Sequence, residues 1–363
     1  MNRRERLIAA IEGKEVDHIP FWPKLNYFGA YQKANAAPFD SMELPEIYDW
    51  VGCAYFMGDV WPFKRTLSGC EATVEKDDNR QITRIKTPAG DLESVSVFDE
   101  STNSWTPHEM PVKDEDDLDK MILYFRSMTF EAQPDYAQKS AGFRAQAEAA
   151  GKYAVLANLG QSPLMHFIEL IAGLQEGHFF LIDCEEKVQE LFEAMHQVNL
   201  QKAKIMAEGC EADLICLYEN TSSTMISPDQ YEKYCMPHLI EYAEIFRDAG
   251  KKLILHMCGH IDGMIEHFVK VPAWGYEAIT TPPVGNTHLE RVRAQTDKLL
   301  IGGSNACLWM KEPDEIIAGL EQELDALPHH RGLVLNTGGE LPQGCPPETL
   351  RKVQAWIETY PVK

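Results

Sequence analysis

The sequence predicts an α/β protein folded as a (β/α)8 TIM barrel, and three observations lead to this prediction. From about residue 150 onward, short aliphatic runs alternate with longer amphipathic stretches, as in βα units on a parallel sheet. Clusters of polar residues recur just after many of these runs, where a barrel gathers its catalytic groups. No Gly-x-Gly-x-x-Gly turn follows a strand, so a doubly wound open sheet is the less favoured alternative.

The elements follow from apolar patterning and from start and stop signals. The expected strands are Cys53–Met57, Tyr153–Asn158, Ala212–Tyr218, Lys252–Met257, Tyr276–Thr280, Leu299–Gly303 and Gly332–Asn336. The expected helices are Pro163–Leu174, Glu185–Glu208, Pro228–Ala249, Ile261–Lys270, Leu289–Gln295, Pro313–Ala326 and Pro347–Tyr360. Proline early in a helix, followed by an acid in the first turn, supports the starts at Pro228 and Pro313. A closed barrel needs an eighth strand, and the sequence pattern between Val60 and Glu148 does not place it.

We expect residues 1–363 to form one barrel domain with two additions. Residues 1–50 are expected to be an N-terminal helical segment. Residues 66–130 are expected to be an insertion of antiparallel hairpins and a linker, because the stretch Ala72–Val97 alternates around turn residues at 77–79 and 88–91.

Composition narrows the function classes. The net charge of −22 disfavours binding to nucleic acid or to an anionic membrane surface. No apolar run approaches the roughly 20 residues that span a bilayer, and no apolar stretch follows the basic start. The nine cysteines have no disulfide-framework spacing, which suits a reducing compartment. We therefore expect a cytoplasmic enzyme.

The most informative motif is His256-Met257-Cys258 at the end of an expected strand. Side chains two apart on a strand share a face, so the imidazole and the thiol would point together toward the barrel mouth. This pair is half of a tetrahedral zinc site, although a buried cysteine beside a core histidine is the alternative. Cys345, in a loop rich in glycine and proline, is the expected third ligand, and Glu219 is a candidate fourth ligand.

Other polar and aromatic residues near strand ends are candidate site residues. Glu219 and Asn220 begin a polar run directly after an expected strand, and Asp59 follows the first one. We expect these three to be catalytic. Small-molecule pockets are lined mainly by apolar and aromatic groups. The expected substrate pocket contains Phe21, Trp22, Tyr27 and Trp61.

Several segments resemble the uroporphyrinogen decarboxylase superfamily. They are residues 4–20, 226–228, 234–238, 302–303 and 346–350. The decarboxylases of this superfamily carry an Arg-Gln-Ala-Gly-Arg signature, which the corresponding stretch Pro20–Phe28 lacks. The superfamily's zinc-dependent, corrinoid-linked methyltransferases instead place His-x-Cys after a barrel strand and a further cysteine in the last strand's loop. The chain is similar to this second branch.

The resemblance implies Zn²⁺ at His256 and Cys258, with the third ligand left open. Family members that methylate coenzyme M read Gly-Cys-Gly where this chain has Gly338-Gly339-Glu340, so Cys345, Glu340 or Glu219 completes the set. The implied reaction moves a methyl group from a small methylated substrate, for which we favour a methoxylated aromatic, to the Co(I) corrinoid of a separate corrinoid protein. A metal-free lyase of the decarboxylase type and a methylcorrinoid:thiol methyltransferase are the alternatives. A homodimer is left open.

Overall fold

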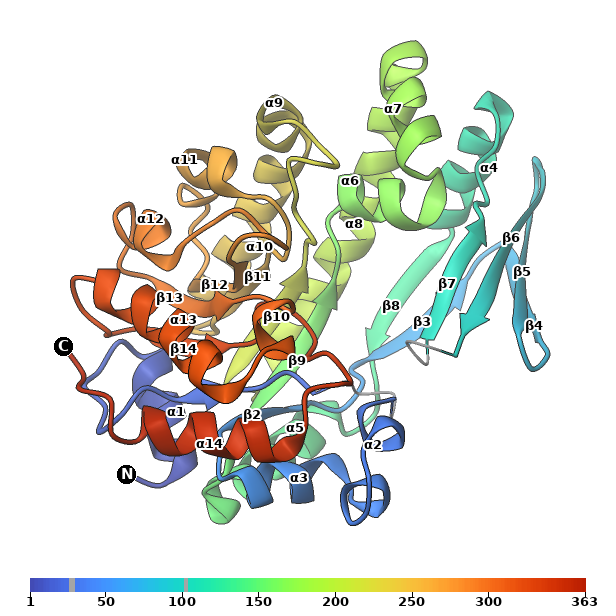
Figure 1. Cartoon of the computed structure of the whole chain (residues 1–363). Coiled ribbons are helices and arrows are strands. Elements are labelled where there is room, and N and C mark those ends of the chain that lie inside the picture. The colour runs from blue at the N-terminus through green and yellow to red at the C-terminus, as the bar shows by residue number, and fades with distance from the viewer. Residues whose placement is uncertain (26–29, 101–103) are drawn as a thin grey trace.

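The computed structural model describes residues 1–25, 30–100 and 104–363, and its centre is a barrel (Figure 1). Within these residues, eight parallel strands form one sheet in the order β1-β14-β13-β12-β11-β10-β9-β2. The strands are β1 (Phe21–Trp22), β2 (Tyr55–Gly58), β9 (Tyr153–Gly160), β10 (Leu214–Tyr218), β11 (Leu253–His256), β12 (Gly275–Thr280), β13 (Leu299–Ser304) and β14 (Leu333–Asn336). The end strands also meet, because the amide of Ala54, just before β2, donates to the carbonyl of Phe21 at 3.0 Å. The predicted (β/α)8 barrel is confirmed.

Helices follow the strands and cover the outside of the barrel (Figure 1). After β9 come α6 (Pro163–His166), the π-helix η2 (Phe167–Ile171), α7 (Leu174–Asp183) and α8 (Glu185–Gly209). After β10 come α9 (Pro228–Gln230), the π-helix η3 (Tyr231–Cys235) and α10 (Met236–Asp248). The remaining barrel helices are α5 (Tyr136–Ala150), η4 (Asp262–Met264), α11 (Ile265–Phe268), α12 (Leu289–Arg293), η5 (Leu308–Met310), α13 (Pro313–Ala326) and α14 (Pro347–Ile357). The two helices predicted at 163–174 and 228–249 are therefore each interrupted by a π-helical turn.

The eighth barrel strand, which the sequence pattern did not place, is β1. β1 pairs in parallel with β14, with Trp22 opposite Asn336. It is two residues long and lies between Pro20 and Pro23, so it is too short to show a periodic pattern. The segment 1–50, predicted to be helical, contains this strand together with α1 (Arg3–Ile11), α2 (Ala30–Ala34), η1 (Phe39–Ser41) and α3 (Leu44–Val51).

An antiparallel insertion leaves the barrel after β2 and returns before α5. At its base, β3 (Phe63–Leu67) pairs with β8 (Met128–Ala132). Beyond the base, its described residues form a four-stranded sheet of β4 (Glu71–Lys76), β5 (Arg80–Thr87), β6 (Gly90–Asp99) and β7 (Ser104–Glu109), and then the helix α4 (Glu115–Arg126). The insertion thus includes the predicted segment 66–130 and extends a few residues beyond it at each end. Its helix α4 packs on the barrel helix α8.

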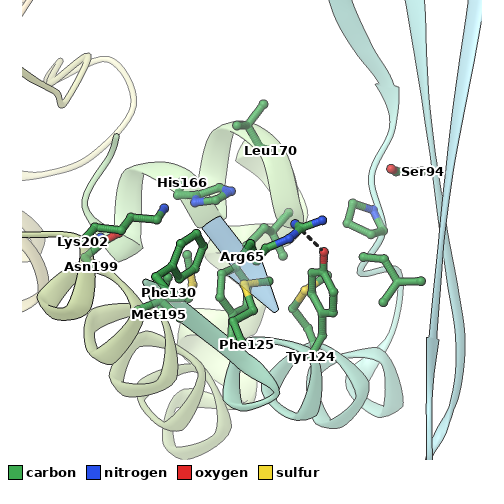
Figure 2. Close-up of a pocket in the computed structure, with 16 residues that line it drawn as sticks. Arg65, Ser94, Tyr124, Phe125, Phe130, His166, Leu170, Met195, Asn199 and Lys202 are labelled. Carbon is green, nitrogen blue, oxygen red and sulfur yellow. Dashed lines mark hydrogen bonds between the residues drawn. The ribbon is translucent and has the colours of Figure 1, made fainter. Parts of the chain in front are cut away.

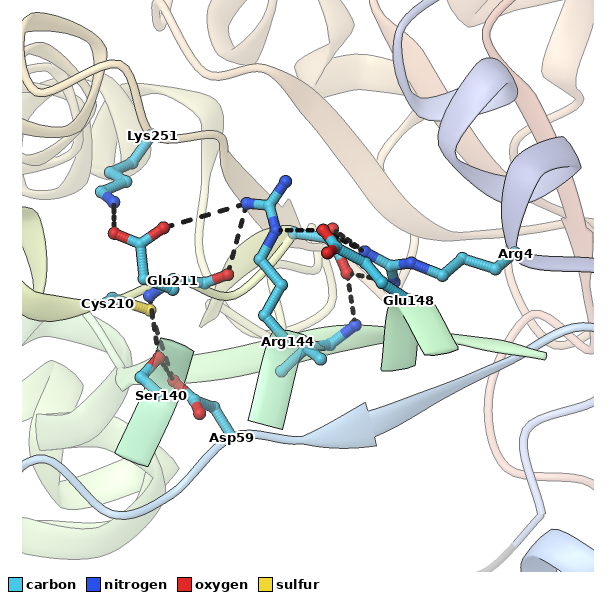
Figure 3. Close-up of polar contacts among 10 residues, drawn as sticks. Arg4, Asp59, Ser140, Arg144, Glu148, Cys210, Glu211 and Lys251 are labelled. Carbon is cyan, nitrogen blue, oxygen red and sulfur yellow. Dashed lines mark hydrogen bonds and ion pairs between the residues drawn. The ribbon is translucent and has the colours of Figure 1, made fainter. Parts of the chain in front are cut away.

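A buried ion pair fixes α1 against the N-terminal ends of β9 and β10. The guanidinium of Arg4 donates two hydrogen bonds to the carboxylate of Asp213, at 2.7 and 2.8 Å, and both side chains are buried. A further nitrogen–oxygen contact of 3.9 Å links Arg4 to Glu148, which also pairs with Arg144 (Figure 3). Contacts at this end of a barrel serve stability, because the catalytic groups of such barrels lie at the opposite end.

Among the described residues, no helix has both the length and the apolar character that crossing a membrane requires.

Candidate functional site

Three neighbouring strands place a tyrosine, a histidine and a glutamate side by side at the C-terminal end of the barrel. The register pairs Tyr218 of β10 with His256 of β11, and His256 with Glu277 of β12. The rings of Tyr218 and His256 lie 5.2 Å apart between centroids. The Nδ1 atom of His256 contacts the Oε2 atom of Glu277 through a short hydrogen bond. His256 and Glu277 are both buried.

Glu277 is the centre of a buried polar network. The ammonium of Lys24, just after β1, lies 3.3 Å from Oε1 of Glu277, and the side-chain amide of Asn336 donates to the same oxygen at 3.0 Å. Lys24 lies over the rings of Trp22 and Tyr218, with its nitrogen 5.6 and 5.8 Å from their centroids. Side chains from β11, from β14 and from the segment after β1 therefore converge on the one carboxylate that β12 carries.

The backbone at β12 turns Glu277 toward this network. The following residue, Ala278, has a positive φ of 66°, and the register between β12 and β13 shifts there. A bulge of this kind re-aims a side chain and is common beside active sites. A left-handed alanine also costs energy, and such strain persists where the surrounding structure enforces it.

The charged groups in this network stabilise one another's ionised forms. Burial lowers the pKa of His256, but the charge of Glu277 acts in the opposite direction and the net shift is upward. Burial raises the pKa of Glu277, but the charges of Lys24 and His256 outweigh it and the net shift is downward. The structure thus favours an imidazolium at His256 held against an ionised Glu277, with Lys24 as a second cation.

Cys258 and Asn220 lie next to His256 on adjacent loops. The thiol of Cys258 donates to the side-chain oxygen of Asn220 at 3.6 Å, and the amide of Asn220 donates to the carbonyl of His256 at 3.0 Å. Asn220 has a positive φ of 48°, which its short polar side chain tolerates. At Gly259 a Cβ atom would lie 2.2 Å from the Cβ atom of Ser222, so a side chain at this position would collide with the polar loop.

Glu169 joins the site from the π-helix η2. Its carboxylate accepts hydrogen bonds from Asn220 at 3.0 Å and from Gln161 at 2.6 Å. Burial raises the pKa of Glu169, although these two hydrogen bonds oppose the shift. Single π-helical turns occur frequently at functional sites. Here the turn presents a carboxylate to the loop that carries Asn220.

Glu219 does not face the histidine. Its two carboxylate oxygens accept hydrogen bonds from the backbone amide and the hydroxyl of Ser162, at 2.7 and 2.8 Å, at the start of α6. Ser162 also lies 3.7 Å from the thiol of Cys235. Burial raises the pKa of Glu219 to about 7, and the hydrogen bonds from Ser162 limit the rise. These contacts assign Glu219 to holding the loop between β9 and α6 in place.

Cys345 is packed in the hydrophobic core beside the loop that follows β14. Its side chain is buried, and its backbone carbonyl accepts the hydroxyl of Tyr31 at 2.8 Å. Burial raises the pKa of the Cys345 thiol to about 12, so this thiol is protonated at neutral pH. Glu340, the alternative ligand in the same loop, is exposed.

The remaining predicted site residues have separate environments. Asp59 accepts hydrogen bonds from Ser140 at 2.7 Å and from Cys210 at 3.5 Å, which assigns it to packing between β2, α5 and the end of α8 (Figure 3). Phe21 stacks on Trp309, and Trp61 is 66% exposed. Of the other two residues predicted to line the substrate pocket, Trp22 lies beside Lys24. Tyr27 is outside the described residues.

These residues provide only part of the ligand set that a zinc ion needs. Histidines that bind metals usually donate their other ring N–H to a carboxylate, as His256 does to Glu277, and Cys258 lies nearby. A catalytic zinc normally takes three protein ligands. Throughout the described residues, however, no group of three or more His, Cys, Asp or Glu side chains is arranged to hold a metal ion. The predicted set of His256, Cys258, Cys345 and Glu219 is not assembled in this structure.

The sequence indicated no role for four residues of this site: Lys24 and Asn336, which lie in candidate clusters at strand ends, and Glu169 and Glu277, which do not. One signal was readable, because Glu277 is a charged residue inside an otherwise apolar run that was correctly predicted as a strand. A charge in such a run needs a partner. Lys24 and Glu169 gave no such sequence signal, because charged residues are common in loops and helices.

Comparison with known proteins supports the fold and the superfamily. Residues 138–360 match the model of the family described as uroporphyrinogen decarboxylase (URO-D). The methylcobamide:CoM methyltransferase MtbA of Methanosarcina mazei is 24% identical over 181 residues, which are 48% of this chain and 50% of that protein. The chain therefore spans about half the length of this curated relative. A solved structure, a methyltransferase from Methanosarcina mazei, superposes with a TM-score of 0.60 and 15% identity over 99% of both chains. This last likeness shows the fold.

Proposed function

This chain belongs to the uroporphyrinogen decarboxylase family, and on that premise we propose that it is a corrinoid-linked methyltransferase. The observation that carries the proposal is the pairing of His256 with Glu277 beside Cys258 at the C-terminal end of the barrel. The likeness to a methylcobamide:CoM methyltransferase supports the same reaction class. The corrinoid would be presented by a separate protein, as the resemblance to corrinoid-linked methyltransferases implies.

The methyl donor that we propose is a methoxylated aromatic compound. Its demethylation breaks the bond between the methyl carbon and the ether oxygen, and the electron pair of that bond stays on the oxygen. A Co(I) corrinoid would supply the electron pair of the new cobalt–carbon bond, and the phenolate oxygen would need a proton. Tyr218 is partly exposed, and its ring, 5.2 Å from that of His256 between centroids, supplies aromatic surface there.

His256 is the residue best placed to supply that proton. Glu277 and burial act on its pKa in opposite directions, and the net rise keeps the ring protonated at neutral pH. Nδ1 is engaged by Glu277, so the proton on Nε2 is the one available to a leaving oxygen. General acid catalysis of this kind contributes about 10²–10⁴-fold to a rate. Lys24 and Asn336 position Glu277, and through it His256.

Thiol methylation is the second candidate function, and the match to a methylcobamide:CoM methyltransferase favours it. In that reaction the methyl group leaves the cobalt and is taken up by a thiolate. An anaerobic assay distinguishes the two candidates. Demethylation predicts that free Co(I) cobalamin and 4-methoxybenzoate yield methylcobalamin and 4-hydroxybenzoate in equal amounts. Thiol methylation predicts that methylcobalamin is consumed only when coenzyme M is added. Activity in neither direction would overturn the proposed function.

Zinc at His256 and Cys258 stays a prediction, and metal analysis tests it. The comparison uses protein purified without chelator: the wild type, Cys258→Ala and Cys345→Ala, with the exposed Cys307→Ala as the matched control. About one zinc per chain, lost only in Cys258→Ala, would place the metal at the His256 pair without Cys345. Loss in both variants would show that Cys345 moves to the metal. Zinc bound at Nε2 of His256 would displace the proton that the acid role requires, so absence of zinc from the wild type after reconstitution is the result that the acid role predicts.

A further inference from the structure

A cavity of about 310 Å³ lies between the insertion and the outside of the barrel (Figure 2). The insertion contributes β3, α4 and β8 to its wall, and the barrel contributes α6, η2 and α8. Much of the lining is apolar, with Phe125, Phe130 and Tyr124 among its aromatic groups and methionines beside them. Volumes of this order suit small organic ligands.

Basic groups point into this cavity, and all of its lining residues lie in the described chain. Lys202 of α8, His166 of α6 and Arg65 of β3 line it, and none of the lining residues is acidic. Acidic residues outnumber lysine and arginine in this chain, whose net charge is −22, so a basic cluster without acidic neighbours is unusual for its composition. Figure 2 shows Lys202 and His166 on the barrel side, with Arg65 reaching in from the insertion.

The protein provides few hydrogen-bond or ion-pair partners for the basic groups of this cavity. Lys202 lies over the rings of Phe63 and Phe130, with its nitrogen 5.8 and 4.9 Å from their centroids. The structure gives its ammonium no hydrogen bond or ion pair with any described residue, and the same holds for the ring of His166. Arg65 donates to the hydroxyl of Tyr124 at 3.2 Å. Burial lowers the pKa of Lys202 to about 8, and burial together with Lys202 lowers that of His166 to about 4.

We propose that this cavity binds a small organic anion with an aromatic body, whose carboxylate pairs with Lys202 and Arg65. The rings of Phe125 and Phe130 would contact the apolar part of the ligand. A partly buried cation without a counterion is costly, and an anionic ligand would provide the missing charge. This site is distinct from the His256 site, and the proposal does not depend on the proposed function.

The wall of the cavity also reaches the candidate active site. Asn199, which lines the cavity, donates to the backbone carbonyl of Gln161 at 2.8 Å. The side chain of Gln161 in turn donates to Glu169 at 2.6 Å, and Glu169 bonds Asn220. A ligand in the cavity would therefore pack on the segment that holds Glu169 in place.

The test compares a carboxylate with its uncharged analogue. Binding of benzoate and of benzamide to the full chain is measured by isothermal titration calorimetry at pH 7. It is measured for the wild type, for Lys202→Met, and for Lys204→Met as the matched control. Lys204 is an exposed lysine on the same helix. We expect saturable benzoate binding, at least tenfold weaker binding of benzamide, a loss of at least tenfold in Lys202→Met, and no change in Lys204→Met.

A second measurement locates the ligand. The ring protons of His166, assigned by comparison with His166→Gln, should shift in the NMR spectrum when benzoate is added and stay in place with benzamide. Equal binding of the two compounds, no binding of benzoate, or undiminished binding by Lys202→Met would overturn the proposal. Binding of inorganic phosphate without benzoate would also overturn it, because the aromatic lining would then have no role.

Discussion

His256 and Glu277 form the charged pair on which the rest of the site depends. The two residues face each other across adjacent strands, and Lys24 and Asn336 hold the carboxylate from the other side. Removing one member of a buried ionic network leaves its partners uncompensated, which costs about 3–5 kcal/mol in measured cases. Single substitutions here should therefore affect both the chemistry and the stability, and the two effects need separate measurements.

Glu277→Gln should lower the pKa of His256. The carboxylate charge is what opposes burial, so its loss shifts the ring toward the neutral form. We expect methyl transfer at pH 7 to fall about 10²-fold. NMR titration of the His256 ring measures the pKa in chelator-treated protein, and Glu266→Gln on the exposed face of α11 is the control. An unchanged pKa of His256 in Glu277→Gln would contradict this account of the site.

At the scale of elements, the loop after β11 must lie close to the loop after β10. Gly259 allows this approach, because the backbone carbonyl of Thr221 and the side chain of Ser222 occupy the space where a Cβ atom would be. The backbone of His260 also bonds Ser222 and Ser223 across the same gap. The position of Cys258 is thus set by a contact between two loops.

Gly259→Ala should displace Cys258 and reduce methyl transfer at least tenfold while the barrel stays folded. Gly263→Ala is the matched control, because nothing lies within 4 Å of a Cβ atom there and its φ is not in the left-handed region. Circular dichroism checks the fold, and the reaction rate reports on the site. Equal rates in the two variants would show that the loop contact does not position Cys258.

The N-terminal helix is a second element whose attachment can be tested. Arg4→Ala leaves the buried Asp213 without its partner, so we expect the free energy of unfolding to fall by about 3–5 kcal/mol. Arg126→Ala breaks only an exposed pair with Glu190 and should cost about 0–1 kcal/mol. Urea denaturation measures both. The rate per folded molecule should be unchanged in Arg4→Ala, because this ion pair lies at the opposite end of the barrel from His256.

An element could be predicted from the sequence where it was long enough to show an apolar pattern. Strands such as Leu253–His256 are apolar runs between turn signals, so their type and direction were readable. β1 consists only of Phe21 and Trp22 and has no pattern of its own, so its pairing with β14 depends on the closed barrel. The His256–Cys258 pair was predictable because both residues lie at one strand end. Glu277 and Lys24 could be joined to it only once the strand order and register were known.

At the scale of the whole molecule, the insertion and the barrel meet around an uncompensated Lys202. Burial, followed by the charge of Arg65, lowers the pKa of Lys202 from 10.5 to about 8. Between these two pH values the unfolded chain binds more protons at Lys202 than the folded chain does. The contribution of Lys202 to stability therefore rises with pH from about 8 to 10.5, and its full cost is present below pH 8.

Lys202→Met should accordingly stabilise the ligand-free protein at pH 7, on the order of 1 kcal/mol, since the side chain is only partly buried. The gain should shrink as the pH rises toward 10.5. Urea denaturation at a series of pH values measures it, with Lys204→Met as the control. A variant that is less stable than the wild type at pH 7 would show that the contacts of Lys202 with Phe63 and Phe130 outweigh its buried charge.

The central claim is that the His256–Cys258 end of this barrel carries out methyl transfer involving a corrinoid. The most direct measurement follows the cobalamin absorption spectrum under anaerobic conditions, with 4-methoxybenzoate and Co(I) cobalamin, and with methylcobalamin and coenzyme M. We predict protein-dependent methyl transfer in one of the two mixtures for the wild type and for Cys307→Ala, and a rate at least 10²-fold lower for Cys258→Ala. No transfer in either mixture, or equal rates in Cys258→Ala and the wild type, would contradict the account.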